Sequence, residues 1–309
     1  MPWAGELAAL CTALCWSGSS LLFALATRRV GGLAVNQFRL LLAVPFLLGL
    51  HLLLLGPAWP ELSGDRLWLL CASGLAGLVI GDIGYFYALG VIGPRIAAVL
   101  MATWPAMATG ISWVWDGDSP SLPMAIGIAI TMTGVMLVLA RNDGKTWNVP
   151  VTKWRWRLAI GGALLGALGQ AVGSVLVAVV ARPAPDLPDG LPGLSCALVR
   201  MVAASAGILV VTGVQGQLLA SRAVLADRRA FGAAAGGMLF GPVVGVWLSM
   251  IALGIGPVGL VATLMATTPV FLLPITRFVY GARAGIIGIV GTLLAVGGVA
   301  VLLLTRPAR

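Results

Sequence analysis

The chain has 309 residues, of which 60% are hydrophobic and 9% are charged, and its mean hydropathy is +1.03. This composition leaves too few polar side chains to cover a water-soluble core, so it excludes a soluble globular protein. The net charge of +9 would suit nucleic-acid binding, but the basic residues flank apolar segments and form no nucleic-acid-binding module. We therefore expect anionic lipid headgroups as partners, and no nucleic acid.

Apolar segments long enough to cross a bilayer follow one another along the whole chain. A membrane-spanning helix needs about 20 such residues. The expected spans are 4–26, 33–55, 67–89, 94–115, 120–140, 158–181, 193–219, 231–253, 256–279 and 284–305. Their continuous apolar character indicates helices, because barrel strands would alternate. The sequence predicts an all-α integral membrane protein with ten transmembrane helices.

The second half of the chain repeats the first at an offset of about 164 residues. Residues 100–105 read LMATWP and residues 264–269 read LMATTP, and the last helices share two glycines followed by valine at matching positions. A repeat of five helices is odd, so the second copy must insert upside down, with a substrate site near the membrane midplane. We predict a first repeat at 1–142, a basic linker at 143–156 and a second repeat at 157–309.

A family resemblance rests on several of these residues. The first helix carries Trp16, the second Arg39, and residues 81–93 read GDIGYFYALGVIG before the Pro105 segment. This pattern resembles the EamA-type branch of the drug/metabolite transporter superfamily. The resemblance implies a secondary transporter of amino acids, other metabolites or drug-like compounds. The Gly-Glu-Arg-like turn of that family reads GDS at 117–119 and GAR at 281–283, so its glutamate is absent twice.

The basic residues are distributed unevenly between the two sides of the membrane. Twelve of them fall in loops on one side, namely Arg28, Arg29, Arg95, Arg141, Lys145, Lys153, Arg155, Arg157, Arg222, Arg228, Arg229 and Arg283. By the positive-inside rule this side is cytoplasmic, which leaves both termini outside. The resemblance implies instead that both termini are cytoplasmic. The compact loops suit a bacterial inner membrane.

Charges inside the predicted spans are expected to be functional, because an ion within a bilayer is costly. Asp82 and Arg39 each lie about 10 Å below the same surface. Asp82 is either a proton or cation coupling site or the fixed ion-pair partner of Arg39. The equivalent position in the second half is Val246, so we expect one ionisable centre. Arg200, the inverted copy of Arg39, either contacts a substrate carboxylate or snorkels to headgroups.

Three tryptophans lie far from either predicted interface: Trp16, Trp104 and Trp247. A tryptophan at this depth either stacks on a substrate or packs as a large apolar residue. Pro105 and Pro269 predict helix breaks, because each frees a backbone carbonyl that protein or a cavity must satisfy. The hydroxyl of Thr103 is placed to serve such a carbonyl or a substrate.

Enzymatic chemistry is not expected from this sequence. It has no Gly-rich nucleotide loop, and its single histidine, His51, leaves Cys11 and Cys15 without enough ligands for a metal site. We therefore expect no cofactor and no catalytic residue.

The resulting prediction is a secondary-active exporter of small metabolites that works by alternating access, with proton coupling or uniport both open. The alternative is a flippase, or a binding and assembly protein, for a lipid-linked amphiphile. The sequence does not decide between a monomer and a homodimer.

Overall fold

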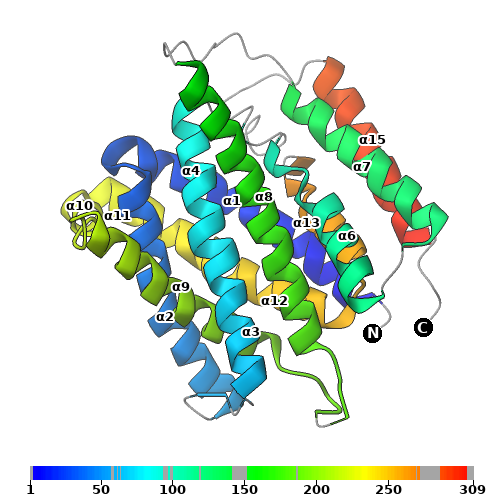
Figure 1. The fold of residues 1–309 in the computed structure, drawn as a ribbon, viewed down its shortest axis with the longest axis horizontal. Helices are drawn as coiled ribbons and strands as arrows, with labels where there is room; N and C mark the ends of the chain where they lie inside the picture. The colour runs from blue at the N-terminus through cyan, green and yellow to red at the C-terminus, as the bar shows by residue number, and fades with distance from the viewer. Residues whose placement is uncertain are drawn as a thin grey trace. The chain divides into compact units, whose positions relative to one another are not determined.

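The regular structure of this protein is helical in a computed structural model (Figure 1). The structure describes residues 3–56, 59, 60, 62, 64–92, 97, 100–117, 120–140, 152–185, 187–268, 270, 271 and 286–304. Outside its helices, these residues form one isolated bridge, between Ala184 and Leu187. The helices are α1 Ala4–Val30, α2 Gly32–Leu55, α3 Gly64–Gly74, α4 Asp82–Val91, α6 Trp104–Asp116, α7 Leu122–Ala140, α8 Lys153–Ala181, α9 Gly193–Val214, α10 Arg222–Ala226, α11 Arg228–Met238, α12 Val246–Ile255, α13 Val258–Met265 and α15 Ile286–Leu304. Two π-helices, η1 Leu75–Gly81 and η2 Leu239–Gly245, join α3 to α4 and α11 to α12.

Seven helical stretches in the described residues are long and apolar enough to cross a membrane. They are Ala4–Thr27, Gly32–Leu55, Gly64–Ala88, Lys153–Ala181, Gly193–Val214, Arg228–Ile255 and Ile286–Leu304. The apolar helix Leu122–Leu137 is shorter, and the predicted spans 94–115 and 256–279 lie only partly within the described residues. The all-α membrane class is thus confirmed, while the number of ten spans stays a prediction.

The chain divides into two compact units that both draw on its two halves. The first unit contains Met1–Val79 and Leu176–Ile255, and the second contains Ile80–Val175 and Gly256–Arg309. The predicted repeats 1–142 and 157–309 therefore each contribute helices to both units. Whether these repeats are inverted copies is taken up below.

The helix bounds themselves repeat along the chain. Four elements of the first half, α3, η1, α4 and α7, recur in the second half as α11, η2, α12 and α15, and both bounds of every pair differ by 164 residues. The π-helices are the most informative pair, because a π-turn is rare and depends on local packing. The repeat seen in the residue pattern is therefore also a repeat of local conformation.

In the first unit, α2 packs on α9 in the antiparallel sense. The hydroxyl of Ser205 donates to the carbonyl of Leu40 at 2.9 Å, and Nε2 of His51 lies 2.9 Å from the hydroxyl of Ser195. Partner numbers on α9 fall as those on α2 rise, which fixes the direction. All four of these residues are buried, so the polar groups satisfy one another inside the apolar span.

Gln37 of α2 binds the connection between α9 and α10. Its amide nitrogen donates to the hydroxyl of Thr212 at 2.9 Å and to the carbonyl of Leu218 at 2.7 Å. Its amide oxygen accepts from the backbone N–H of Ser221 at 2.7 Å. Gln37 and Thr212 are both fully buried, so one side chain fixes a segment more than 170 residues away in sequence.

Replacing Gln37 by leucine should therefore destabilise the first unit. A buried polar group that loses its partner costs about 1–3 kcal/mol, and Gln37→Leu removes the partner of the Ser221 N–H as well as two donated bonds. Thermal unfolding of the purified protein in detergent measures the effect. The exposed Gln217 provides the control, and equal melting temperatures for Gln37→Leu and Gln217→Leu would contradict the expectation.

The same end of the first unit carries an ion pair. Nε of Arg29 in α1 donates to Oδ2 of Asp227 at 2.7 Å, and Oδ1 of Asp227 accepts from the backbone N–H groups of Arg229 and Ala230 at the start of α11. The Ala230 N–H and the Arg29 side chain lower the pKa of the Asp227 carboxyl below its usual value. The carboxylate is therefore favoured in the folded protein.

This lowered pKa gives a pH dependence with a defined sign. The folded-state pKa lies below the unfolded value of about 3.9, so Asp227 contributes stability above that pH and loses it as pH falls through the folded pKa. We expect native protein to melt above Asp227→Ala at pH 7, with the difference shrinking below about pH 4. Melting curves across this range measure it. A difference that persisted unchanged into acid would contradict the assignment.

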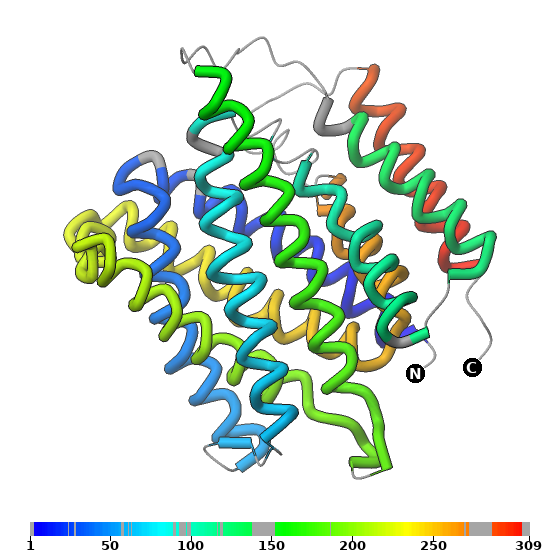
Figure 2. The backbone as a smooth tube through the Cα atoms, in the orientation of Figure 1, coloured from blue at the N-terminus to red at the C-terminus, as the bar shows by residue number. Residues whose placement is uncertain are grey.

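In the second unit, α7 and α15 run side by side and antiparallel (Figure 2). Gly134 lies against the backbone of Gly291 and Ala295, while Gly127 lies against Leu302 and the carbonyl of Gly298. Small residues let two membrane helices approach closely, which is the main source of packing energy between helices in lipid. The predicted match of Gly127 and Gly134 with Gly291 and Gly298 is therefore one contact surface.

Candidate functional site

The predicted site residues divide between the two compact units. Trp16, Arg39, Arg200 and Trp247 belong to the first unit, in α1, α2, α9 and α12. Asp82, Thr103, Trp104 and Pro105 belong to the second unit, and Pro269 lies outside the described residues. Each group is described by itself below.

Trp16 lies on the π-helix η2 of the first unit. A Cβ atom added to Gly245 would be 3.2 Å from Nε1 of Trp16, and one added to Gly241 would be 3.5 Å from its Cζ3. The indole thus contacts η2 where two glycines remove the side chains between them. The hydroxyl of Ser19, one turn along α1, donates to the carbonyl of Gly237 at 2.9 Å.

The π-helix η2 differs from its neighbours in composition as well as in turn. It contains Pro242, which cannot donate a backbone hydrogen bond. Because π-turns within α-helices occur frequently at functional sites, the half-buried Trp16 stands at a position where ligand contact is reasonable. Trp247, just beyond η2 in α12, is also half-buried.

Arg39 is buried, with 5% of its surface exposed. Its Nε donates to Oδ1 of Asn36 at 2.8 Å, and its guanidinium carbon lies 5.4 Å from the centre of the Phe23 ring. Asn36 therefore orients the guanidinium plane in the membrane interior, and Phe23 adds a cation–π contact.

Arg200 takes the corresponding place on α9 and is 2% exposed. Its Nη1 lies 3.8 Å from the sulfur of Met250. Its own carbonyl lies where Gly74 of α3 has no side chain, so any Cβ at position 74 would collide with it. At 2% exposure Arg200 is buried by protein, which differs from the predicted alternative of a side chain that snorkels to headgroups.

Asp82 is the first residue of α4, directly after η1, and is half-buried. It lies one turn before Tyr85 and interacts with it electrostatically. The backbone on either side of Asp82 approaches α8 closely, since Gly84 lies against Gly162 and Gly81 against Gly166. Asp82 and Arg39 belong to different units, so their predicted ion pair stays a prediction.

Trp104 is buried, and α6 begins at this residue with Pro105 in its first turn. A helix accepts proline there, because the missing N–H has no partner in any case. The hydroxyl of Thr103 donates to the carbonyl of Leu100 at 2.7 Å, and that of Thr267 donates to Leu264 at 2.6 Å. The same turn thus occurs in both halves, 164 residues apart.

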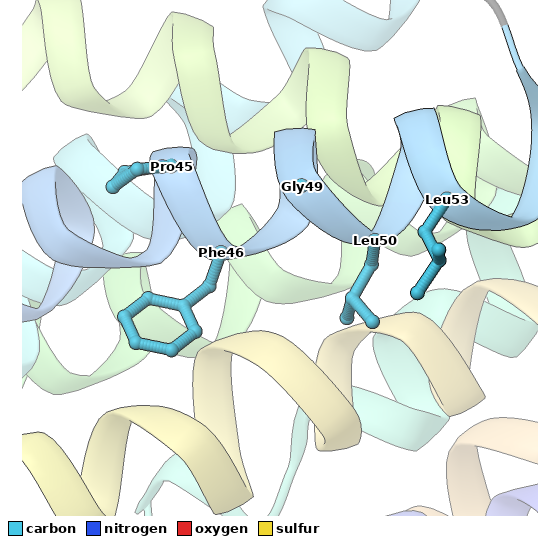
Figure 3. Close-up of a pocket in the computed structure, with 5 residues that line it drawn as sticks. All are labelled: Pro45, Phe46, Gly49, Leu50 and Leu53. Atoms are coloured by element: carbon cyan, nitrogen blue, oxygen red, sulfur yellow. The ribbon is translucent and has the colours of Figure 1, made fainter.

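A shallow apolar groove of about 350 Å³ lies on α2 (Figure 3). Pro45, Phe46, Gly49, Leu50 and Leu53 line it, and Phe46, Leu50 and Leu53 project from the same side of the helix. It contains none of the predicted site residues. Its open shape and apolar lining suit a hydrocarbon chain rather than a polar solute.

Several residues of this region were missed by reasoning from the sequence. Asn36 and Phe23 hold Arg39, Gln37 binds the α9–α10 connection, and His51 joins α2 to α9. The run Asn-Gln-Phe-Arg at 36–39 was the available signal, because consecutive polar residues within an apolar span require partners.

Comparison with known proteins agrees with this fold and composition. Residues 3–140 match the EamA-like transporter family. A solved crystal structure, titled only as that of a protein, superimposes with a TM-score of 0.77 at 19% identity and covers 99% of this chain and 98% of its own, which shows a shared fold. The chain is therefore a member of the drug/metabolite transporter superfamily, a membrane transporter with an EamA-like first half.

One curated relative has a different name. It is the phospho-N-acetylmuramoyl-pentapeptide-transferase of Moorella thermoacetica, which is 31% identical over 144 residues. The match covers 43% of this chain and 42% of the transferase. The chain thus spans about two fifths of the length of this relative.

Proposed function

We propose that this protein is a secondary-active exporter of small metabolites, built from two inverted five-helix repeats that give ten membrane spans, and that it works by alternating access. The observation that carries the proposal is the antiparallel pairing of equivalent helices. Copies related by a two-fold axis in the membrane plane run in opposite directions, whereas copies related by an axis along the membrane normal run in the same direction.

Two helix pairs support the inversion independently. In the first unit, α2 pairs with its equivalent α9 through Leu40–Ser205 and His51–Ser195. In the second unit, α7 pairs with its equivalent α15 through the glycine contacts. Both pairs are antiparallel, and the helix bounds that repeat at 164 residues identify them as equivalents.

The substrate site of the proposal lies at the residues that the spans bury or half-bury. Trp16 on η2, Trp247, Trp104 and Thr103 supply aromatic and hydroxyl contacts, and Arg39 and Arg200 supply positive charge. Asp82 supplies a titratable group for proton coupling, next to a π-helix that offers a point of movement. The proposal assigns the chain no enzymatic reaction and no cofactor.

The proposed location is a bacterial inner membrane, with anionic headgroups bound by the basic loops. The exposed Trp154 and Trp156 alternate with Lys153, Arg155 and Arg157 at the start of α8, as expected for an interfacial anchor. The distribution of basic residues further proposes a cytoplasmic side that carries these residues and termini on the opposite side.

The experiment that tests the function is a comparison of extracellular metabolites between cells that express the protein and cells that carry the empty vector. We expect at least one small metabolite to accumulate outside only when the protein is present. Reconstitution in vesicles with that compound then establishes that the protein itself moves it. Identical profiles, together with no movement in vesicles, would reject export.

A second candidate function is movement or binding of a lipid-linked amphiphile. Two observations favour it: the partial similarity to the transferase, whose name states phospho-N-acetylmuramoyl-pentapeptide as its group, and the open apolar groove on α2. The two candidates differ in where a substrate enters. Substitution of Leu50 in the groove by tryptophan should impair a lipid-linked substrate and leave a water-soluble metabolite unaffected.

A further inference from the structure

The buried charge of the first unit has one sign. Among the described residues of this unit, the arginine, lysine, aspartate and glutamate side chains that are buried are those of Arg39 and Arg200. Both carry positive charge, on the two helices that pair in antiparallel fashion. A positive potential inside a low-dielectric interior favours anions over neutral or cationic molecules of the same size.

The register of α2 on α9 places the two arginines at a defined spacing. The hydrogen bond from Ser205 to the Leu40 carbonyl aligns these two residues. Arg39 is one residue from Leu40, and Arg200 is five residues from Ser205 in the opposite axial direction, so the two Cα positions differ by about 9 Å along the interface. This spacing suits a small organic molecule rather than a polymer.

Arg39 is also the better oriented of the two. Asn36 holds its Nε at 2.8 Å and the Phe23 ring lies 5.4 Å from its guanidinium carbon. A guanidinium held in this way loses little freedom when it binds a planar or tetrahedral oxyanion, and arginine is the side chain best matched to both. Holding the group in advance in this way lowers the entropic cost of binding.

The aromatic side chains of α1 extend the same region. Phe23 and Trp16 are two turns apart on α1, and both contact η2 or the end of α11, through Gly237 for Phe23 and Gly241 and Gly245 for Trp16. They therefore lie on one face of α1. An anionic group at Arg39 would leave the rest of its molecule beside these rings.

From these observations we infer that the first unit binds a small organic anion, with a carboxylate or a phosphate monoester at Arg39 and Arg200. The inference names the substrate class of the proposed transporter and rests on that function for its role, although binding is testable without transport.

The test uses matched pairs of probes that differ in charge. The purified protein in a neutral detergent is heated with N-acetyl-L-leucine or N-acetyl-L-leucinamide, and with glucose 6-phosphate or glucose, at ionic strength held constant by potassium chloride. Inorganic phosphate serves as a fifth probe that distinguishes the bare ion from the organic phosphate. A bound ligand raises the melting temperature, by about 2–4 °C for a gain in stability equivalent to a tenfold excess over its dissociation constant.

The expected result is that at least one organic anion raises the melting temperature and its neutral counterpart does not. Arg39→Gln and Arg200→Gln should each remove the rise, while Arg222→Gln, at an exposed position of the same unit, should keep it. Arg39→Lys keeps the charge but not the planar group, and we expect it to fold and to bind at least about tenfold more weakly.

The inference is overturned if neutral and anionic probes stabilise equally, if every anion leaves the melting temperature unchanged, or if both arginine variants retain the rise. If Arg39→Gln does not fold, Arg39→Lys and Phe23→Leu provide the same comparison. Its failure is distinguishable from failure of the proposed function. Anion binding without export would reject the transporter alone, and export restricted to neutral or cationic compounds would reject the anion site alone.

Discussion

Gly134→Val is expected to separate α7 from α15 and to give the largest loss of stability of any single substitution considered for the second unit. A Cβ atom at position 134 would overlap the backbone of Ala295 and Gly291. Backbone atoms cannot rotate away as a flexible side chain can, so the helices must move apart along their contact. Overpacking costs about 1–3 kcal/mol and occasionally more, and we expect the upper end of this range.

The loss is expected to be large because lipid supplies no hydrophobic force that would hold the two helices together. Their association depends on close contact, and Thr131 against Gly298 and Leu302 against Gly127 depend on the same separation. Melting temperature and monodispersity on size exclusion measure the outcome in detergent.

Gly297 provides a matched control on the same helix pair. It is exposed, and a Cβ atom there would have no neighbour within 4 Å. Gly297→Val changes the same residue type on α15 without entering the contact. Native-like melting of both variants would show that the glycine contact contributes little to stability.

The second prediction concerns transport. Asp82→Asn should abolish movement driven by a pH gradient and leave the fold intact, because the amide keeps the size of the carboxyl and cannot exchange a proton at ordinary pH. Asp82 stands alone in this role, since the equivalent residue at the start of α12 is the buried Val246. We expect the initial rate under a pH gradient to fall to the level of protein-free vesicles.

Vesicles with the metabolite identified by the export experiment measure this rate, with and without the imposed gradient. Asp65→Asn is the control, because Asp65 is an exposed acid near the start of α3. Coupling that survived in Asp82→Asn would make Asp82 structural, as in the alternative of a fixed ion pair. Loss of binding as well as coupling would place Asp82 in the substrate site itself.

Much of the fold is predictable from the sequence because its signals are local. Length and hydropathy predicted helices that the structure contains, including those equivalent to the predicted spans 33–55, 158–181 and 193–219. The offset of about 164 residues, found in residue types alone, reappears in the bounds of four helix pairs. Arg39 and Arg200 were singled out because a charge in an apolar span is conspicuous at any position.

The remaining features depend on which helices meet. The partners of Gln37 are more than 170 residues distant, and His51, which the sequence offered only as a lone histidine, becomes a link between α2 and α9. Neither π-helix was predicted, because a π-turn differs from an α-turn by one residue, and composition does not distinguish them. Arg29 and Asp227 lie in separate halves and gave no signal of an ion pair.

The sequence by itself determined that this is a helical membrane protein, where its long helices lie, and that its halves repeat, because each of these follows from the polarity and spacing of neighbouring residues. Only the tertiary structure decided that α2 pairs with α9 and α7 with α15, and that each compact unit draws on both halves. Helix pairing depends on backbone approach at glycines and on hydrogen bonds between distant residues, and neither quantity is encoded in any single segment.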